Sequence, residues 1–296
     1  MPVSSELLLA TTLMVGLLFA PSSFAAKHFT TRCDQAPGSL GDLSGAQKKT
    51  FLKSEDELAA GRYGDAYGDL RGLLAQVPQD APEHAVMAEL TAEAAIFAGE
   101  RSYAISLLKP VEERDGSDCL ARTLLARADA ESGESAERDA EINALIELHK
   151  QSPKSSVGKL DAFLLEQHKL EDGGMVRIWY GLQPWGPHNT HLYSEILDAS
   201  GQTIARLELD SDDPDQVYFR QIHPELAARG DRRYSLDAFA DRTSPDGKVD
   251  REHALIQFFD GAPSYDTVRD RILTIAERSA KMRRDQTSPR ASARAK

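Results

Sequence analysis

The chain has 296 residues, of which 41% are hydrophobic and 28% are charged, a composition that suits a globular protein of about two domains. Its formal net charge is -12, but residues 278–296 hold seven basic side chains and one acidic one, so residues 1–277 carry -18. A body this acidic excludes nucleic acid as the main partner, because phosphate binding needs a basic face. Few apolar residues occur over 279–296, which predicts a disordered basic tail.

The N-terminus carries an uncharged apolar run from Leu7 to Phe19, followed by Pro21 and several small residues. This run is shorter than the roughly 20 residues that span a bilayer, and the small residues suit a signal peptidase. The sequence therefore predicts a signal peptide over 1–26, an exported protein that is periplasmic or secreted, and no membrane span after cleavage. The first residues lack Lys and Arg, so retention of this segment as an anchor stays an alternative.

Cys33 and Cys119 are the only cysteines of the chain. In an exported protein such a pair predicts one disulfide, which would tie an extended N-terminal segment (27–46) to the region that follows it. The alternative is two unrelated thiols, because the geometry of a pair cannot be read from a sequence. Neither cysteine has a partner at CxxC spacing, which disfavours a thiol redox enzyme.

Apolar residues recur at helical spacing over 47–153, and glycines interrupt the pattern. Gly61, Gly99 and Gly133 are 38 and 34 residues apart. A period in the thirties with a glycine turn is typical of repeated helix pairs. One such pair cannot bury its apolar face alone, so we expect about three pairs to stack.

The region 47–153 resembles the tetratricopeptide repeat family. The best match is the run Gly61-x-Tyr63-x-x-Ala66, which Pro78 follows, and small residues that let paired helices approach fall at Ser54, Ala92 and Ala126. The resemblance implies a curved helical array that binds a protein or peptide partner on a concave face lined by the first helix of each pair.

In the family's register, the residues that look inward are Lys48, Phe51, Glu55, Glu89, Glu93, Arg127 and Glu131. Four of these seven are acidic, which would suit a basic peptide or an amine. The alternative is that they are ordinary solvated helix faces.

The rest of the chain predicts a small α+β domain with a mainly antiparallel sheet over 173–278, after a connecting helix and linker over 154–172. Strands are expected at 175–182, 191–197, 203–209, 233–240 and 252–259, since these runs are rich in β-branched and aromatic residues between turn signals. Helices are expected from near Asp212 and from Ser264. The fold class is therefore a multi-domain chain with a helical repeat array followed by an α+β domain.

The densest cluster of reactive side chains lies between residues 179 and 191. His188 and His191 suggest a metal-assisted hydrolase of the cell envelope, if further ligands join them. Aromatic side chains in the same stretch suggest a carbohydrate-binding module, and these are Trp179, Tyr180 and Trp185. Both readings are alternatives to packing and surface roles.

We assign no catalytic residue, cofactor or metal, because the sequence has no glycine-rich nucleotide loop, no GxSxG elbow and no HExxH motif. The features together favour an exported interaction or scaffolding protein that binds a protein or peptide. A role as an enzyme is the less favoured reading.

Overall fold

The computed structural model describes residue 33 and residues 43–185, 190–212, 214–215, 217–243, 249–259 and 261–287. The chain divides into two compact units at Leu165 and Glu166, a helical unit before this point and a unit built on a sheet after it. Within the described residues, no helix is long and apolar enough to cross a membrane.

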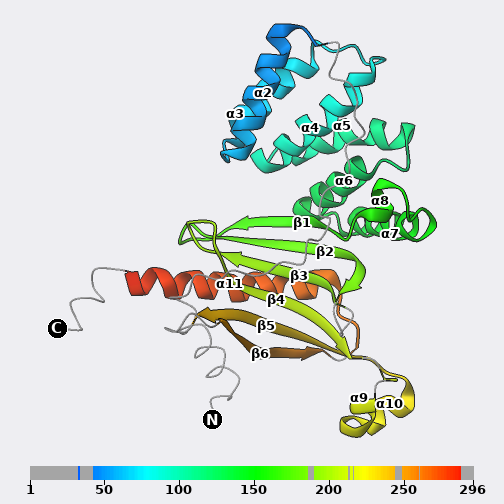
Figure 1. Cartoon of the computed structure of the whole chain (residues 1–296), viewed down its shortest axis with the longest axis vertical. Helices are drawn as coiled ribbons and strands as arrows, with labels where there is room; N and C mark the ends of the chain where they lie inside the picture. Colours follow the sequence, from blue (N-terminus) through cyan, green and yellow to red (C-terminus); the bar gives the residue numbers. More distant parts are fainter. Residues whose placement is uncertain are drawn as a thin grey trace, which may run out of the picture. The chain divides into compact units, whose positions relative to one another are not determined.

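The helical unit is a succession of helical hairpins (Figure 1). Its helices are α2 (Gly45–Ala59), α3 (Tyr63–Leu74), α4 (Pro82–Ala98), α5 (Arg101–Arg114), α6 (Cys119–Ser132), α7 (Ser135–Gln151) and the short α8 (Ser156–Lys159). Helix α2 begins with a capping box, in which the Ser44 hydroxyl accepts from the Gln47 amide and the Gln47 side chain accepts from the Ser44 amide.

The three glycines predicted as turns all adopt the left-handed conformation, with φ of 73° at Gly61, 88° at Gly99 and 80° at Gly133. The residue after each glycine donates its backbone N–H to the carbonyl five residues earlier, with N–O distances of 2.8, 2.8 and 2.9 Å. This is the hydrogen bond by which a glycine ends a helix and reverses the chain. Three successive hairpins are therefore closed by the same turn.

Equivalent positions in the three hairpins are buried in the same way. Five residues after each turn glycine lie Ala66, Ala104 and Arg138, which are 0%, 0% and 2% exposed. Seven residues before each glycine, the small side chains are also fully buried, at Ser54, Ala92 and Ala126. Small side chains let neighbouring helices approach closely. In the third hairpin, Arg138 occupies the position five residues after the glycine, where the first two hairpins have alanine, and it pairs with Asp139 at 2.8 Å.

Side chains near the glycine turns connect one hairpin to the next. The ring of Tyr63 stacks on Phe97 at 4.5 Å, and the guanidinium of Arg127 lies 4.0 Å from the centre of the Phe97 ring. Glu131 then pairs with Arg127 at 3.0 Å and with Arg101 at 3.1 Å. These contacts join α3, α4, α5 and α6, so they fix how the first, second and third hairpins stack.

The second unit holds a six-stranded antiparallel meander in the order β1 to β6. The strands are β1 (Ala162–Lys169), β2 (Met175–Trp185), β3 (Thr190–Leu197), β4 (Thr203–Asp212), β5 (Arg233–Thr243) and β6 (Val249–Phe259). Two short helices, α9 (Val217–Ile222) and α10 (Pro224–Arg229), connect β4 to β5. The long helix α11 (Tyr265–Thr287) runs along one face of the sheet (Figure 1).

One core lies between α11 and the sheet, and apolar residues of β2 to β5 meet one stripe of the helix there. From the helix, Val268 and Ile272 are fully buried in it, and from β2 so are Val176 and Ile178. The strands and the stripe on α11 agree with the predicted antiparallel α+β architecture.

Three sequence-based boundaries in this region are wrong. Residues 162–169 were expected within a connecting helix but form β1, because they pair with β2 through the turn where the Leu170 amide donates to the Gly174 carbonyl at 2.9 Å. The helix expected from Asp212 begins at Val217, since β4 continues through Asp212 beside β5.

The third boundary is the start of the basic tail, expected at residue 279. Helix α11 continues to Thr287, with Ala280 fully buried and Arg283 bound to Asp172 at 2.7 Å. The contacts that hold this part of the helix come from the turn between β1 and β2, far away in the sequence.

Cys33 and Cys119 form a disulfide with an S–S distance of 2.09 Å. Cys119 is the first residue of α6, so the bond attaches the segment before α2 to the third hairpin. The two cysteines are 86 residues apart in the sequence, and closing such a long loop restricts the unfolded chain strongly.

We predict that replacing both cysteines by serine lowers the free energy of unfolding of the helical unit by about 2–5 kcal/mol. Urea unfolding followed by circular dichroism, with and without dithiothreitol, measures the loss. The reductant should destabilise the wild type and leave the Cys33→Ser, Cys119→Ser protein unchanged. An unfolding midpoint of the wild type that the reductant does not move would contradict the expectation.

Candidate functional site

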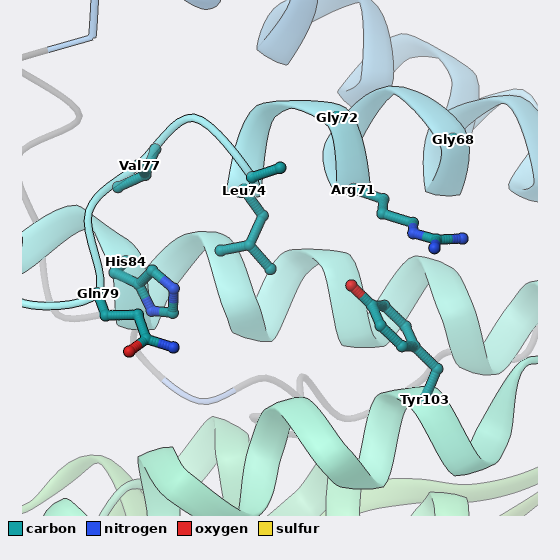
Figure 2. Close-up of a pocket in the computed structure, with 9 residues that line it drawn as sticks. Gly68, Arg71, Gly72, Leu74, Val77, Gln79, His84 and Tyr103 are labelled. Carbon is teal, nitrogen blue, oxygen red and sulfur yellow. The ribbon is translucent and has the colours of Figure 1, made fainter.

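A pocket of about 690 Å³ opens in the helical unit between α3, the loop after it, α4 and α5 (Figure 2). The residues that line it are Gly68, Arg71, Gly72, Leu74, Ala75, Val77, Gln79, His84 and Tyr103. Its volume is in the range of pockets that bind small molecules or peptide side chains. Helices α3 and α5 are the second helices of their hairpins, so the pocket lies away from the concave face that the sequence implied.

One end of the pocket combines a cation with aromatic rings. The guanidinium of Arg71 lies 5.3 Å from the centre of the Tyr103 ring, which also meets Tyr67 edge-on at 5.7 Å. In Figure 2, Arg71 reaches down from α3 towards Tyr103 of α5. Arg71 is exposed and makes no ion pair with any residue that the structure describes, so its N–H donors are open to a ligand.

His84, Gln79 and Val77 lie at the other end of the pocket, and Leu74 lies between the two ends (Figure 2). The Nδ1 atom of His84 is buried and has no hydrogen-bond partner among the described residues. Burial lowers the pKa of His84, and the positive charge of Arg114 lowers this pKa further. His84 therefore enters the pocket as a neutral ring with one nitrogen unsatisfied.

Helix α3 presents glycines at intervals of four residues, Gly64, Gly68 and Gly72, and the last two line the pocket. A glycine inside a helix costs about 0.5–1 kcal/mol relative to alanine. A Cβ atom added at any of these three positions would meet nothing within 4 Å, so packing inside the protein does not require glycine there. The glycines leave the backbone of α3 bare along this face.

The residues expected on the concave face take several different environments. Lys48 and Glu55 are exposed, and Glu93 is half-buried. The others are buried, as Phe51, Glu89 and Arg127 are, or have a buried side chain, as Glu131 does. None of the seven lines the pocket. Arg127 and Glu131 bind each other and neighbouring hairpins, which gives them a structural role.

Glu89 of α4 is held against Asp118, the residue that caps α6. The Asp118 carboxylate accepts from the Ala121 amide at 3.0 Å. Burial raises the pKa of Glu89 to about 8, and the charge of Asp118 and a hydrogen bond to it add to the increase. Glu89 is therefore largely protonated at neutral pH, beside the carboxylate that caps the first helix of the next hairpin.

The side chains that are described in the aromatic and histidine cluster of residues 179–191 do not form one site. Trp179 stacks on Tyr193 at 6.0 Å and donates its indole N–H to Glu195 at 3.2 Å, whereas Tyr180 packs against the core that α11 covers. Consecutive strand residues point to opposite faces, so these two rings cannot form one platform. His188 and the side chains of Trp185 and His191 lie outside the described residues.

The sheet carries one buried group of polar side chains away from the α11 core. Asp237 accepts from the Ser235 hydroxyl at 3.3 Å and lies 3.6 Å from the His253 Nε2 atom. Burial and the nearby Asp210 carboxylate raise the pKa of Asp237. Within the part of the chain that the structure describes, no three His, Cys, Asp or Glu residues are grouped so that they hold a metal ion.

Sequence reasoning did not find the pocket, because its residues come from three helices and a loop that only the folded array brings together. The spacing of four between Gly64, Gly68 and Gly72 was visible in the sequence. In a run that is otherwise helical, such spacing indicates a helix face kept clear of side chains, which is the signal that was available.

We predict that Gly68→Ala and Gly72→Ala each stabilise the protein by about 0.5–1 kcal/mol, because alanine restricts the unfolded chain and nothing in the fold obstructs its methyl group. Thermal unfolding of each variant provides the measurement. Gly99→Ala is the opposite control, since φ is 88° at this glycine and a side chain there is strained. A loss of stability in the α3 variants would mean that the glycines are needed for internal packing.

A second prediction concerns the pH dependence of stability. The folded protein holds the proton of Glu89 up to about pH 8, whereas the unfolded chain releases it near 4.5. Stability from this group is complete below the unfolded value and decreases by about 1.4 kcal/mol for each pH unit until pH passes the folded value. Glu89→Gln should remove this contribution.

Chemical unfolding from acid to alkaline pH, compared between wild type and Glu89→Gln, tests this directly. The difference in unfolding free energy should grow in favour of the variant as pH rises towards 8. Glu55→Gln, a substitution at an exposed site on α2, should follow the wild type. Parallel curves for all three proteins would show that Glu89 is not protonated in the fold.

No family model matches the chain, and neither curated proteins nor solved structures give a significant match. The function is therefore inferred from the chain's own geometry. Among the described residues, the pocket between α3, α4 and α5 is the concavity on which this inference is based.

Proposed function

We propose that the protein is an exported interaction protein whose tetratricopeptide-like array binds a protein or peptide partner. The observation that carries this proposal is the pocket in the array, which has an available Arg71 cation at one end, the His84 ring beside Gln79 at the other and bare helix backbone at Gly68 and Gly72. A concave site that combines apolar side chains with a few polar groups is the usual setting for ligand binding.

The regularity of the hairpins supports the tetratricopeptide-like part of the proposal. The turn glycines are 38 and 34 residues apart, share the left-handed conformation, and precede fully buried alanines in the first two hairpins. Stacked helix pairs of this kind present extended surfaces, and such surfaces commonly bind segments of other proteins. The third hairpin, with Arg138 in place of a small residue, is the most divergent repeat.

Export is supported by two features, a disulfide in the structure and an apolar run in the sequence. The disulfide between Cys33 and Cys119 fits an oxidising compartment, where such bonds persist. The apolar run of residues 7–19 is typical of a signal peptide, and it lies outside the described residues.

A selection of short random peptides displayed on phage, carried out against the full-length protein, tests whether the array binds peptides. Hydrogen exchange of the protein with a synthetic copy of a selected peptide then shows where binding occurs. We expect slower exchange of backbone amides over 63–114, which covers α3, α4 and α5.

The sheet provides the internal control, since amides of β2 to β5 should exchange at the same rate with and without peptide. Protection confined to the sheet would contradict the proposal, and so would a selection that yields no peptide with measurable affinity for the protein.

A further inference from the structure

We infer that the pocket recognises an acidic peptide segment, in which an Asp or Glu side chain lies next to an apolar one and the peptide backbone runs along the glycine face of α3. This inference rests on the proposed function and specifies its ligand. It differs from the concave surface that the resemblance implied, which is acidic and lies on the first helices of the hairpins.

The positive charge of the pocket favours a ligand that carries a carboxylate. The whole chain has 47 acidic and 35 basic side chains, yet none of the described residues that line the pocket is acidic. Arg71 provides the positive charge there, and its guanidinium rests on Tyr103 without an ion pair to a described residue. A guanidinium binds a carboxylate through two parallel hydrogen bonds, so this cation is suited to an Asp or Glu side chain.

The middle of the pocket selects an apolar neighbour for that carboxylate. Leu74 lies between the Arg71 end and the His84 end, and Val77 lies on the His84 side (Figure 2). An apolar side chain of the peptide would be removed from water against them. At the far end, the exposed amide of Gln79 can hydrogen-bond to peptide N–H and C=O groups, whereas the Nδ1 atom of His84 is buried beyond the reach of a ligand.

The glycines indicate that the carboxylate belongs to the interior of a peptide. Gly68 and Gly72 lie on either side of Arg71 along α3, and a Cβ atom at either would meet only open space. A peptide backbone can therefore approach α3 closely before and after it passes the guanidinium. A chain terminus at Arg71 would use the glycine on one side only, so we assign the carboxylate to a side chain.

The test uses two phage libraries of short random peptides fused at both ends, identical except that the second lacks Asp and Glu. Both are selected against the full-length protein. We expect binders from the first library, enriched in Asp or Glu beside an aliphatic or aromatic residue, and none of comparable affinity from the second. A third library that displays free carboxyl termini distinguishes a terminal carboxylate from a side chain.

Variants of the protein then show whether the selected peptides use the pocket. Arg71→Glu should weaken the affinity of a selected peptide by at least about tenfold, because a favourable charged hydrogen bond is replaced by repulsion. Arg62→Glu makes the same change of charge at an exposed arginine in the same hairpin that does not line the pocket, and it should leave the affinity unchanged.

The role of the glycine face in peptide binding is tested with a matched control variant as well. Gly68→Ala and Gly72→Ala should weaken binding while the proteins stay folded, whereas Gly64→Ala, on the same face but outside the pocket, should bind like the wild type. Thermal unfolding of each variant, recorded beside its affinity, separates a blocked surface from a damaged fold.

Three outcomes would overturn the inference in different ways. Binders that lack carboxylates, or that bind Arg71→Glu as well as the wild type, would refute the acidic ligand and leave peptide binding by the array intact. Failure of every library to yield a binder would refute both. Binders found only in the library of free carboxyl termini would replace the side-chain carboxylate with a terminal one and refute the assignment made here.

Discussion

The helical unit depends on three left-handed glycines, because each of them ends one helix and turns the chain so that the next helix packs beside it. A side chain at Gly61, Gly99 or Gly133 would strain this turn, and φ lies between 73° and 88° at all three. The shared turn places the same positions of each hairpin in the interior, which explains why Ala66 and Ala104 are equivalent. It also explains why an arginine at the third equivalent position is fully buried and needs a carboxylate beside it.

The same stacking determines which polar side chains have partners inside the array and where a pocket remains between its helices. On α4 and α6, polar residues that the resemblance directed inward have internal neighbours, since Glu89 is buried beside Asp118 and Arg127 binds Glu131. Between α3 and α5, the side chains that would fill the seam are missing because α3 carries glycine. A pocket forms there as a direct consequence, on helices that the register of the family did not emphasise.

The sequence predicted those features that depend on residue type and spacing within a short segment. The turn glycines, the strands from 175 onwards and the apolar stripe on α11 all follow from spacing and residue type, and the structure has them. The errors arose where partners distant in the sequence decide the outcome. Residues 162–169 have a spacing of apolar side chains that suits a short helix as well as a strand, and pairing with β2 selects the strand. The end of α11 depends on Asp172, over a hundred residues before Arg283, so composition alone assigned it to a tail.

Because the chain has more acidic than basic side chains, its arginines have many carboxylates with which to form ion pairs. Most of the described arginines bind carboxylates of their own unit. Arg122 bridges Glu112 and Glu141 at 2.6 and 2.7 Å and thereby joins α5, α6 and α7. Glu89 is a buried acid of another kind, since burial and the nearby Asp118 carboxylate raise its pKa to about 8. Arg71 differs from both cases, because it rests on an aromatic ring in a pocket lined by no described carboxylate. Its guanidinium is exposed there, and this availability is the basis on which we propose that Arg71 binds a ligand.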